Sequence, residues 1–365
     1  MFGNIFKDKK VLITGNTGFK GSWLSIWLLK LGAQVYGISK NLPSSPSMFE
    51  ELGIGEKIVY FKEDIRRLGR MLEIIKEVKP DFLFHLAAQP IVSLSYKEPI
   101  ETISSNVMGT ANILEALRIN NQRCAAVIIT SDKCYDNVEW IWGYRENDKL
   151  GGKDIYSGSK GAAELIFKSY FHSFLKNSPI KAVSARAGNV IGGGDWAMDR
   201  IVPDCMRSWS INKAVEIRMP NATRPWQHVL EPLSGYLTLA MVIMMEHNEI
   251  NGESFNFGPN TEQNYTVREL IEDMSRLWGF DDSRKACSII EDVDFSEAGL
   301  LKLNCDKALV HLKWLPVLGY KKMIEFTTLW YYEFYKKSSD MFEYTLKQIE
   351  EYESIAASKR LIWTK

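Results

Sequence analysis

The sequence Lys10-Val11-Leu12-Ile13-Thr14-Gly15-Asn16-Thr17-Gly18-Phe19-Lys20-Gly21 decides the fold. A short apolar run ends in a glycine-rich turn, and a helix and a second strand follow. This order of elements is typical of the βαβ unit that binds dinucleotides. Gly15 permits the tight turn, Gly18 lets backbone N–H groups approach a pyrophosphate, and Gly21 lets helix and strand pack closely. We therefore expect a dinucleotide site here, although a plain tight turn would show the same glycines.

Short apolar strands alternate with helices through most of the chain. After the second strand at residues 34–38, we expect strands at 58–61, 81–85, 125–130, 180–187 and 254–257. This alternation predicts an α/β fold, a Rossmann-type doubly wound parallel sheet. We assign residues 1–190, with return segments at about 230–258, to the dinucleotide-binding domain. We assign residues 191–365 mainly to a smaller C-terminal substrate-binding domain, because Trp, Arg and Pro become more frequent there.

The composition excludes several classes of protein. Of 365 residues, 45% are hydrophobic and 25% charged, and 45 basic residues balance 45 acidic ones. Without a basic excess we expect no nucleic-acid partner. No apolar run reaches 18 residues and the N-terminus has no apolar signal core, so we expect no membrane span and no secretion. Five scattered cysteines show no metal-ligand spacing, which predicts no metal site and a reduced, cytoplasmic protein.

Tyr156 and Lys160 lie four residues apart in an expected helix at 154–176. Residues at this spacing share one face of a helix. An ammonium beside a phenol favours the phenolate, so we expect the pKa of Tyr156 to fall from about 10 toward neutrality. Tyr156 would then be a general base or acid at working pH. An ordinary surface helix would also show such a pair.

The glycine spacing G-x-x-G-x-x-G and the Tyr–Lys pair together resemble the short-chain dehydrogenase/reductase superfamily. In its extended members, residues such as Asp64 and Ile65 cap the adenine, and small residues such as Ala87 and Ala88 let the backbone lie against the cofactor. The second strand ends in Ser39-Lys40-Asn41, without the acidic residue that binds the adenosine ribose. The choice between NAD and NADP stays open here. Lys40 would accept a 2′-phosphate, or it is solvated while an Asn or Ser bonds the ribose.

Arginine and tryptophan residues are frequent after residue 191, and this cluster suggests a second phosphorylated ligand. Arginine binds phosphates in a bidentate manner, and aromatic rings stack on bases and sugars. Each arginine alone would more often be a surface ion-pair partner. The substrate-binding residues that we expect are Gln89, Asn189, Arg207, Arg218, Arg224 and His228.

Longer motifs resemble the CDP-glucose 4,6-dehydratase family over about residues 8–335. They include Thr130-Ser131-Asp132-Lys133, Tyr156-Ser157-Gly158-Ser159-Lys160 and Arg224-Pro225-Trp226-Gln227-His228. Related dTDP-glucose dehydratases carry Thr-Asp-Glu where this chain has Ser131-Asp132-Lys133. The resemblance implies conversion of CDP-D-glucose to CDP-4-dehydro-6-deoxy-D-glucose and water, with NAD reduced and regenerated. It also implies a place in deoxysugar and O-antigen lipopolysaccharide biosynthesis.

The resemblance implies a role for each catalytic residue. Tyr156 takes the proton of the sugar 4-hydroxyl while Ser131 bonds the 4-oxygen. Asp132 protonates the departing C6 hydroxyl, and Lys133 removes the C5 proton, for which its pKa of about 10.4 must fall. Alternatively, Lys133 only orients Asp132. Lys160 holds the nicotinamide ribose. The expected cofactor ligands are Gly15, Thr17, Gly18, Phe19, Lys20, Asp64, Ile65, Leu86, Ala87, Ala88, Tyr156 and Lys160.

Superfamily relatives form dimers through a four-helix bundle, which implies a homodimer here, or a tetramer built from it. The corresponding helices are expected at 97–120 and 154–176. Their apolar faces would carry Ile113, Leu114, Leu117, Leu165, Ile166, Tyr170 and Phe171. Two other functions fit the same fold. A nucleotide-sugar 4-epimerase would not need Asp132 and Lys133, and a silent NAD-sensing protein would often lack Tyr156 or Lys160.

Overall fold

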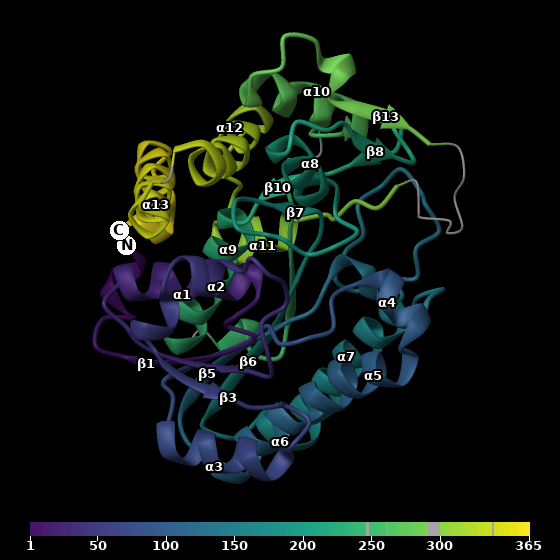
Figure 1. Cartoon of the computed structure of the whole chain (residues 1–365). Coiled ribbons are helices and arrows are strands. Elements are labelled where there is room, and N and C mark those ends of the chain that lie inside the picture. The colour runs from purple at the N-terminus through teal and green to yellow at the C-terminus, as the bar shows by residue number, and fades with distance from the viewer. Residues whose placement is uncertain (246–247, 261, 291–299, 338) are drawn as a thin grey trace.

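One sheet of seven parallel strands forms the centre of the molecule (Figure 1). The computed structural model describes residues 1–245, 248–260, 262–290, 300–337 and 339–365. The strands, in order across the sheet, are β11 (Ser254–Phe257), β6 (Ile180–Ala187), β5 (Cys124–Ile129), β4 (Phe82–His85), β1 (Lys10–Thr14), β2 (Gln34–Ser39) and β3 (Val59–Lys62). Every neighbouring pair is parallel. The expected Rossmann-type sheet is confirmed.

The strand order reverses between β1 and β4. The chain runs outward from β1 through β2 to β3, then returns to the other side of β1 with β4. Thr14 and His85 are partners in the register, so the two segments that follow them diverge from one point at the carboxyl end of the sheet. Ligands of open α/β sheets bind at such a switch point. The glycine turn follows Thr14 directly.

Helices cover both faces of the sheet. Helices α3 (Leu68–Val78), α6 (Gly109–Asn120) and α7 (Ile155–Tyr170) lie on one face, in the lower part of Figure 1. Helices α1 (Phe19–Lys30) and α9 (Leu230–Met244) lie on the other. Strand β5 is buried along its whole length because both of its faces are covered.

The expected helix at 97–120 is interrupted, and so is the helical region at 321–360 near the C-terminus. The region 97–120 contains the end of α4 (Val92–Lys97), α5 (Pro99–Ile103), a π-helical turn at Ser104–Met108 and α6. Pro99 begins α5 because a proline without an N–H is tolerated at a first helical position. The region 321–360 forms α12 (Tyr320–Tyr332), a π-helical turn at Glu333–Lys337, and α13 (Met341–Ser358). Asp340 caps α13 by accepting from two backbone N–H groups.

Four side chains expected at a dimer interface belong to the core of the subunit. Ile113, Leu114 and Leu117 are buried against the sheet, and Phe171 is buried beside them. That part of the expectation is wrong, because these positions form the sheet-facing side of their helices. Leu165 is exposed, while Ile166 and Tyr170 are partly buried.

The remaining elements include those drawn in the upper part of Figure 1, away from the sheet. They are α2 (Met48–Glu51), β7 (Val190–Ile191), α8 (Ile201–Ser210), β8 (Val215–Ile217), β9 (Thr223–Arg224), β10 (Gln227–His228), β12 (Tyr265–Thr266), α10 (Val267–Trp278), β13 (Cys287–Ile289) and α11 (Asp306–Leu312). Helix α13 returns to α1, where Glu353 bonds Trp27 and Lys30. Among the described residues, no helix is long and apolar enough to cross a bilayer.

Candidate active site

A cavity of about 1280 Å3 lies at the carboxyl ends of the strands. The glycine turn, residues 131–133 and the Tyr156–Lys160 face of α7 all line it. Pockets for one small molecule usually measure about 300–1,000 Å3. This cavity therefore has room for a dinucleotide and a second ligand side by side.

The glycine turn is too close to its neighbours for side chains. Gly15 has φ +78°, and a Cβ there would lie 2.7 Å from the backbone nitrogen of Ala87. A Cβ at Gly21 would lie 2.1 Å from the carbonyl oxygen of Gly15. Gly18 precedes the first turn of α1, where backbone N–H groups are free to face an anion. These contacts fit the pyrophosphate of a dinucleotide.

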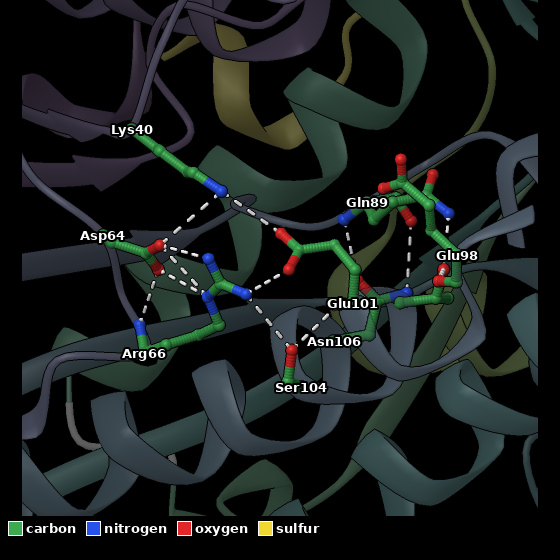
Figure 2. Close-up of polar contacts among 9 residues, drawn as sticks. Lys40, Asp64, Arg66, Gln89, Glu98, Glu101, Ser104 and Asn106 are labelled. Atoms are coloured by element: carbon green, nitrogen blue, oxygen red, sulfur yellow. Dashed lines mark hydrogen bonds and ion pairs between the residues drawn. The ribbon is translucent and has the colours of Figure 1, made fainter.

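An ionic network lines the cavity beyond β2 and β3, at the expected adenosine end (Figure 2). Lys40 lies 3.8 Å from Asp64 and 3.2 Å from Glu101. Arg66 bonds the same two carboxylates. Hydrogen bonds from Arg66 are the main reason that the pKa of Asp64 lies below its usual range. Lys40 is therefore paired with two carboxylates while its side chain stays 53% exposed, and neither sequence alternative included this pairing.

Several other expected cofactor residues line the same wall. They are Thr17, Phe19, Ile65, Leu86, Ala87 and Ala88. The Thr17 hydroxyl donates to the carbonyl of Asn41 at 2.8 Å, and Ser39 donates to Asn16 at 2.8 Å. These side chains fix the loop that follows β2. The Ser39 hydroxyl thus has a hydrogen-bond acceptor within the protein, the side chain of Asn16.

Lys20 lines the same cavity as Asp132 and Lys160. Its pKa is lowered to about 8, first by burial and then by the positive charge of Arg200. Asp132, Lys160 and Asp195 also act on its charge. Arg200 itself bonds Asp195 at 2.7 Å. Sequence reasoning missed the Asp195–Arg200 pair, although the glycine-rich run before Asp195 marks a loop at the end of β6.

Ser131, Asp132 and Lys133 follow β5 in a tight turn. The Ser131 hydroxyl donates to Asp132 Oδ1 at 2.9 Å and accepts from the Lys133 backbone N–H at 3.2 Å. Asp132 lies against Gly188, where a Cβ would be only 1.8 Å from Asp132 Oδ2. All three residues line the cavity, so the structure brings the expected triplet together.

Tyr156 and Lys160 lie on the buried side of α7, with the Lys160 Nζ 6.0 Å from the centre of the Tyr156 ring. Burial raises the pKa of Tyr156 to about 12, and a hydrogen bond with Ser131 opposes this rise. Burial lowers the pKa of Lys160 to about 8. The expected fall in the pKa of Tyr156 is therefore wrong for the protein alone. The helical spacing predicts the shared face correctly, but burial of the Tyr156 phenol outweighs the hydrogen bond with Ser131 and the charge of Arg200.

The expected substrate residues divide into two groups. Asn189, Arg218 and Arg224 line the cavity. Gln89 also lines it, but its amide donates to Thr102 at 2.8 Å and accepts from the Ile91 N–H at 2.5 Å. The side chain of Gln89 therefore supports the loop after β4, as Figure 2 shows.

Arg207 and His228 are not cavity residues, which corrects two expectations. Arg207 donates to the carbonyl of Trp196 at 2.7 Å and pairs with Asp204. The ring of His228 is fully buried and meets Trp23 and Phe326 edge to face. Burial lowers the pKa of His228 to about 3, so the ring is neutral. It fills the core instead of reaching a ligand.

A buried ion pair beneath the cavity fixes α7 to the sheet. Glu164, one turn after Lys160, bonds Arg186 of β6 at 2.8 Å, and both side chains are fully buried. Thr130 donates to Glu164 at 2.5 Å and Ser184 donates at 2.9 Å. Burial alone would raise the pKa of Glu164, but these partners hold it below its usual range. This network was not predicted, because the sequence does not show that Glu164 of α7 and Arg186 of β6 are neighbours in space.

Comparison with known proteins identifies the class. The family model described as GDP-mannose 4,6 dehydratase matches residues 12–327, and the chain belongs to this family. The chain is 44% identical to the CDP-glucose 4,6-dehydratase of Salmonella typhimurium, over 96% of this chain and 98% of that protein.

Solved structures share the fold. The dTDP-glucose 4,6-dehydratase of Bacillus anthracis in complex with NAD has a TM-score of 0.73 and 20% identity, covering 89% of this chain and 96% of its own. The UDP-glucose 4-epimerase of Thermotoga maritima with UDP-glucose has a TM-score of 0.77 and 19% identity, covering 89% of this chain and 99% of its own. At these sequence identities the similarity shows a shared Rossmann-type fold and nothing beyond the fold.

Proposed function

We propose that the chain converts CDP-D-glucose to CDP-4-dehydro-6-deoxy-D-glucose and water. The observation that carries the proposal is one cavity lined by the glycine turn, by Ser131, Asp132 and Lys133, and by Tyr156 with Lys160. An oxidation at C4 needs a group such as Tyr156, whereas an elimination needs an acid and a base in addition. The similarity to the Salmonella typhimurium enzyme over nearly the whole chain supports the same substrate.

NAD is the proposed cofactor. When bound, it accepts a hydride and later returns it, so it is not consumed. The glycine turn, Thr17, Phe19 and Lys20 would hold its phosphates, Leu86 to Ala88 would flank it, and Asp64 and Ile65 would lie at the adenine. Lys40 already balances Asp64 and Glu101, which favours NAD over a cofactor with a 2′-phosphate. The solved dehydratase of Bacillus anthracis holds NAD, which supports this choice.

Tyr156 would act first. It accepts the proton of the sugar 4-hydroxyl, and the Ser131 hydroxyl bonds the 4-oxygen. Lys160 carries positive charge below its pKa of about 8 and would hold the nicotinamide ribose. The 4-ketone that forms acidifies the neighbouring C5–H bond.

Asp132 and Lys133 would act second. Lys133 removes the C5 proton, Asp132 gives a proton to the C6 hydroxyl, and water leaves. Once C6 has received the hydride, Lys133 would return the proton to C5. The Arg218 and Arg224 side chains at the far end of the cavity would bind the diphosphate of the substrate, together with Asn189. Lys133 reaches the cavity from the same turn as Asp132, so acid and base would act on adjacent carbons.

The proposed assembly is a homodimer through the outer faces of α5, α6 and α7. Apolar side chains are exposed there: Met108, Ile119, Leu165 and Phe174. A second copy would cover these side chains in a four-helix bundle, and two dimers would make a tetramer. We also propose a cytoplasmic location, with a role in deoxysugar and O-antigen lipopolysaccharide synthesis.

Incubation of the purified protein with CDP-glucose tests the function. We expect a product lighter by one water, detected by mass spectrometry, without added cofactor being used up. UDP-, dTDP- and GDP-sugars serve as controls for the base. A product of unchanged mass with an inverted C4 centre would contradict dehydration and indicate a 4-epimerase. Turnover of a different nucleotide sugar only would contradict the CDP assignment.

A further inference from the structure

Gln227 in β10 has an amide whose orientation is fixed by its surroundings. The side-chain Nε2 donates to the carbonyl of Gly188 at 3.0 Å and to the carbonyl of Phe257 at 2.9 Å. Only an NH2 group satisfies two carbonyl acceptors, so the amide oxygen must point the other way. Gln227 is 2% exposed, and among the described residues its Oε1 has no hydrogen-bond partner. Such a buried acceptor requires an explanation.

A small cavity lies between Gln227 and Asp132. Its volume is about 10 Å3, close to what one water molecule needs. It is lined by Asp132, Gly188, Asn189, Pro225, Gln227, Gly258, Pro259 and Leu303. Because Gly188 has no side chain, Asp132 Oδ2 reaches this wall, while Oδ1 accepts from the Ser131 hydroxyl. The cavity therefore joins an unpaired acceptor to the back of the proposed acid.

We propose that this cavity holds one water molecule that bridges Gln227 Oε1 and the Asp132 carboxyl group, and that Gln227 is a positioning residue for Asp132. The water donates one hydrogen to the amide oxygen and the other to the carboxyl oxygen. Asp132 is then held from both sides, by Ser131 through Oδ1 and by the water through Oδ2. A carboxyl group held this way keeps one direction toward the C6 hydroxyl during proton transfer.

This role also explains a part of the sequence that the catalytic roles do not use. Gln227 lies in the stretch Arg224-Pro225-Trp226-Gln227-His228, and the backbone N–H of Gln227 bonds the carbonyl of Asn189 at 3.1 Å. The stretch thus places the Gln227 amide of β10 at the same small cavity as Asp132, which lies in the turn after β5. The kinetic part of the inference rests on the proposed function, because it takes Asp132 as the acid of the elimination.

Crystal structures of the wild type and two variants test the water site. Gln227→Met removes the acceptor and keeps the length of the side chain. Gln348→Met is the matched control: Gln348 is also buried, its Nε2 also bonds a backbone carbonyl, and its Oε1 also lacks a partner among the described residues. We expect an ordered water within hydrogen-bond distance of Gln227 Oε1 and Asp132 in the wild type and in Gln348→Met. We expect it to be lost in Gln227→Met. A wild-type structure without this water overturns the proposal.

Kinetics test the positioning role. In Gln227→Met we expect kcat for dehydration to fall by about 10-fold to 100-fold, less than the 10²–10⁴ of losing a general acid. The KM for CDP-glucose and the reduction of bound NAD on substrate addition should stay within about twofold, because Gln227 touches neither. Gln348→Met should match the wild type. Wild-type kcat in Gln227→Met, or an equal loss of the first half-reaction, overturns the positioning role.

A second substitution covers the case in which Gln227→Met does not fold. Gln227→Glu keeps an acceptor toward the water and, when protonated, one O–H donor, which can satisfy one of the two carbonyls. We expect it to keep both the water and the dehydration rate within about fivefold below pH 6, where a buried carboxyl stays protonated. Loss of the water in folded Gln227→Glu would contradict the bridge. If the wild type does not turn over CDP-glucose, the proposed function fails, and the crystal structures still decide the water site.

Discussion

Tyr156 lies where burial and hydrogen bonding act on its phenol in opposite directions. Burial raises its pKa to about 12, and Ser131 and Arg200 oppose the rise. A phenol with a raised pKa is a weak acid, and its phenolate is a correspondingly strong base that binds a proton tightly. The residue is therefore suited to hold the proton of the 4-hydroxyl through the rest of the reaction.

Tyr156→Phe should block the first half-reaction. The 4-hydroxyl proton then has no acceptor, so substrate should not reduce the bound NAD. The absorbance of the reduced nicotinamide in a rapid-mixing experiment measures this step. Retention of bound cofactor in the variant is the control. Substrate-driven reduction at the wild-type rate would show that another group takes the proton.

Lys133→Met should separate oxidation from elimination. Its role begins at the 4-keto stage, so reduction of bound NAD should persist while exchange of C5–H with deuterated water falls by about 10²–10⁴. Asp132→Asn should keep some C5 exchange while net dehydration drops, provided that proton removal precedes loss of the hydroxyl. Fast C5 exchange in Lys133→Met would return Lys133 to the role of orienting Asp132.

Sequence predicted which of the proposed catalytic residues lie together better than it predicted the surroundings of Lys40 and His228. Tyr156 and Lys160 share a face because helical spacing is local, and Ser131 to Lys133 follow a strand end. Lys40 could not be placed, because its partner Glu101 lies 61 positions away. His228 was misassigned for the same reason: its burial depends on Trp23 and Phe326, which the sequence does not show to be neighbours.

At the scale of elements, α7 carries Tyr156 and Lys160, the proposed catalytic pair, and the turn after β5 carries Ser131, Asp132 and Lys133. The Glu164–Arg186 ion pair joins them, and Thr130 of the segment that leads to Ser131 bonds the same carboxylate. Displacement of this pair would change the distance between Tyr156 and Ser131. The sequence predicted α7 as one helix and placed its first residue within one position, since the Asp154 cap and the apolar spacing are local signals.

Glu164→Gln should destabilise the protein strongly. The substitution leaves the buried Arg186 charge without a counter-ion, which typically costs about 3–5 kcal/mol. Unfolding in urea measures the change. Asp273→Asn is the control, because it breaks an exposed pair with Arg276 on α10 and should cost no more than about 1 kcal/mol. Equal effects of the two substitutions would contradict a structural role for the buried pair.

Glu231 at the start of α9 should make stability depend on pH. Burial raises its pKa to about 7, above the ordinary value of 4.5. Between these values the carboxyl is protonated when folded and ionised when unfolded, so unfolding becomes easier as pH rises. The shift corresponds to about 3 kcal/mol lost between pH 4.5 and pH 7. Glu231→Gln should remove this slope in urea unfolding at a series of pH values, and an unchanged slope would assign it to other groups.

At the scale of the whole molecule, the parallel sheet places every segment of the proposed active site at one end. The alternation of strands and helices made this architecture predictable, because strand ends in a parallel sheet meet at one edge. The sequence did not predict the break between α12 and α13, because the alternation of charged and apolar residues continues from one helix into the next. Nor did it predict which helix faces point outward, because apolar side chains line both sides of α6 and α7.

Leu165→Glu should weaken the proposed dimer. Leu165 is 56% exposed on the outer face of α7, and a charge there would oppose burial against a second copy. Light scattering at micromolar concentration should show the monomer mass for this variant and the dimer mass for the wild type. Val310→Glu, on the exposed side of α11, should leave the mass unchanged. A monomeric wild type would contradict the dimer.

The position of Ser131 has a consequence for how protons circulate. Its hydroxyl donates to Asp132 and is hydrogen-bonded to Tyr156. In the proposed reaction Tyr156 gains one proton and Asp132 loses one. After each turnover Tyr156 therefore holds an extra proton, and Asp132 lacks the proton that it needs for the next turnover. Ser131 is placed to pass the surplus across, since it can accept from Tyr156 while it donates to Asp132. The enzyme would then reset itself internally, and its turnover rate should not depend on the concentration of buffer.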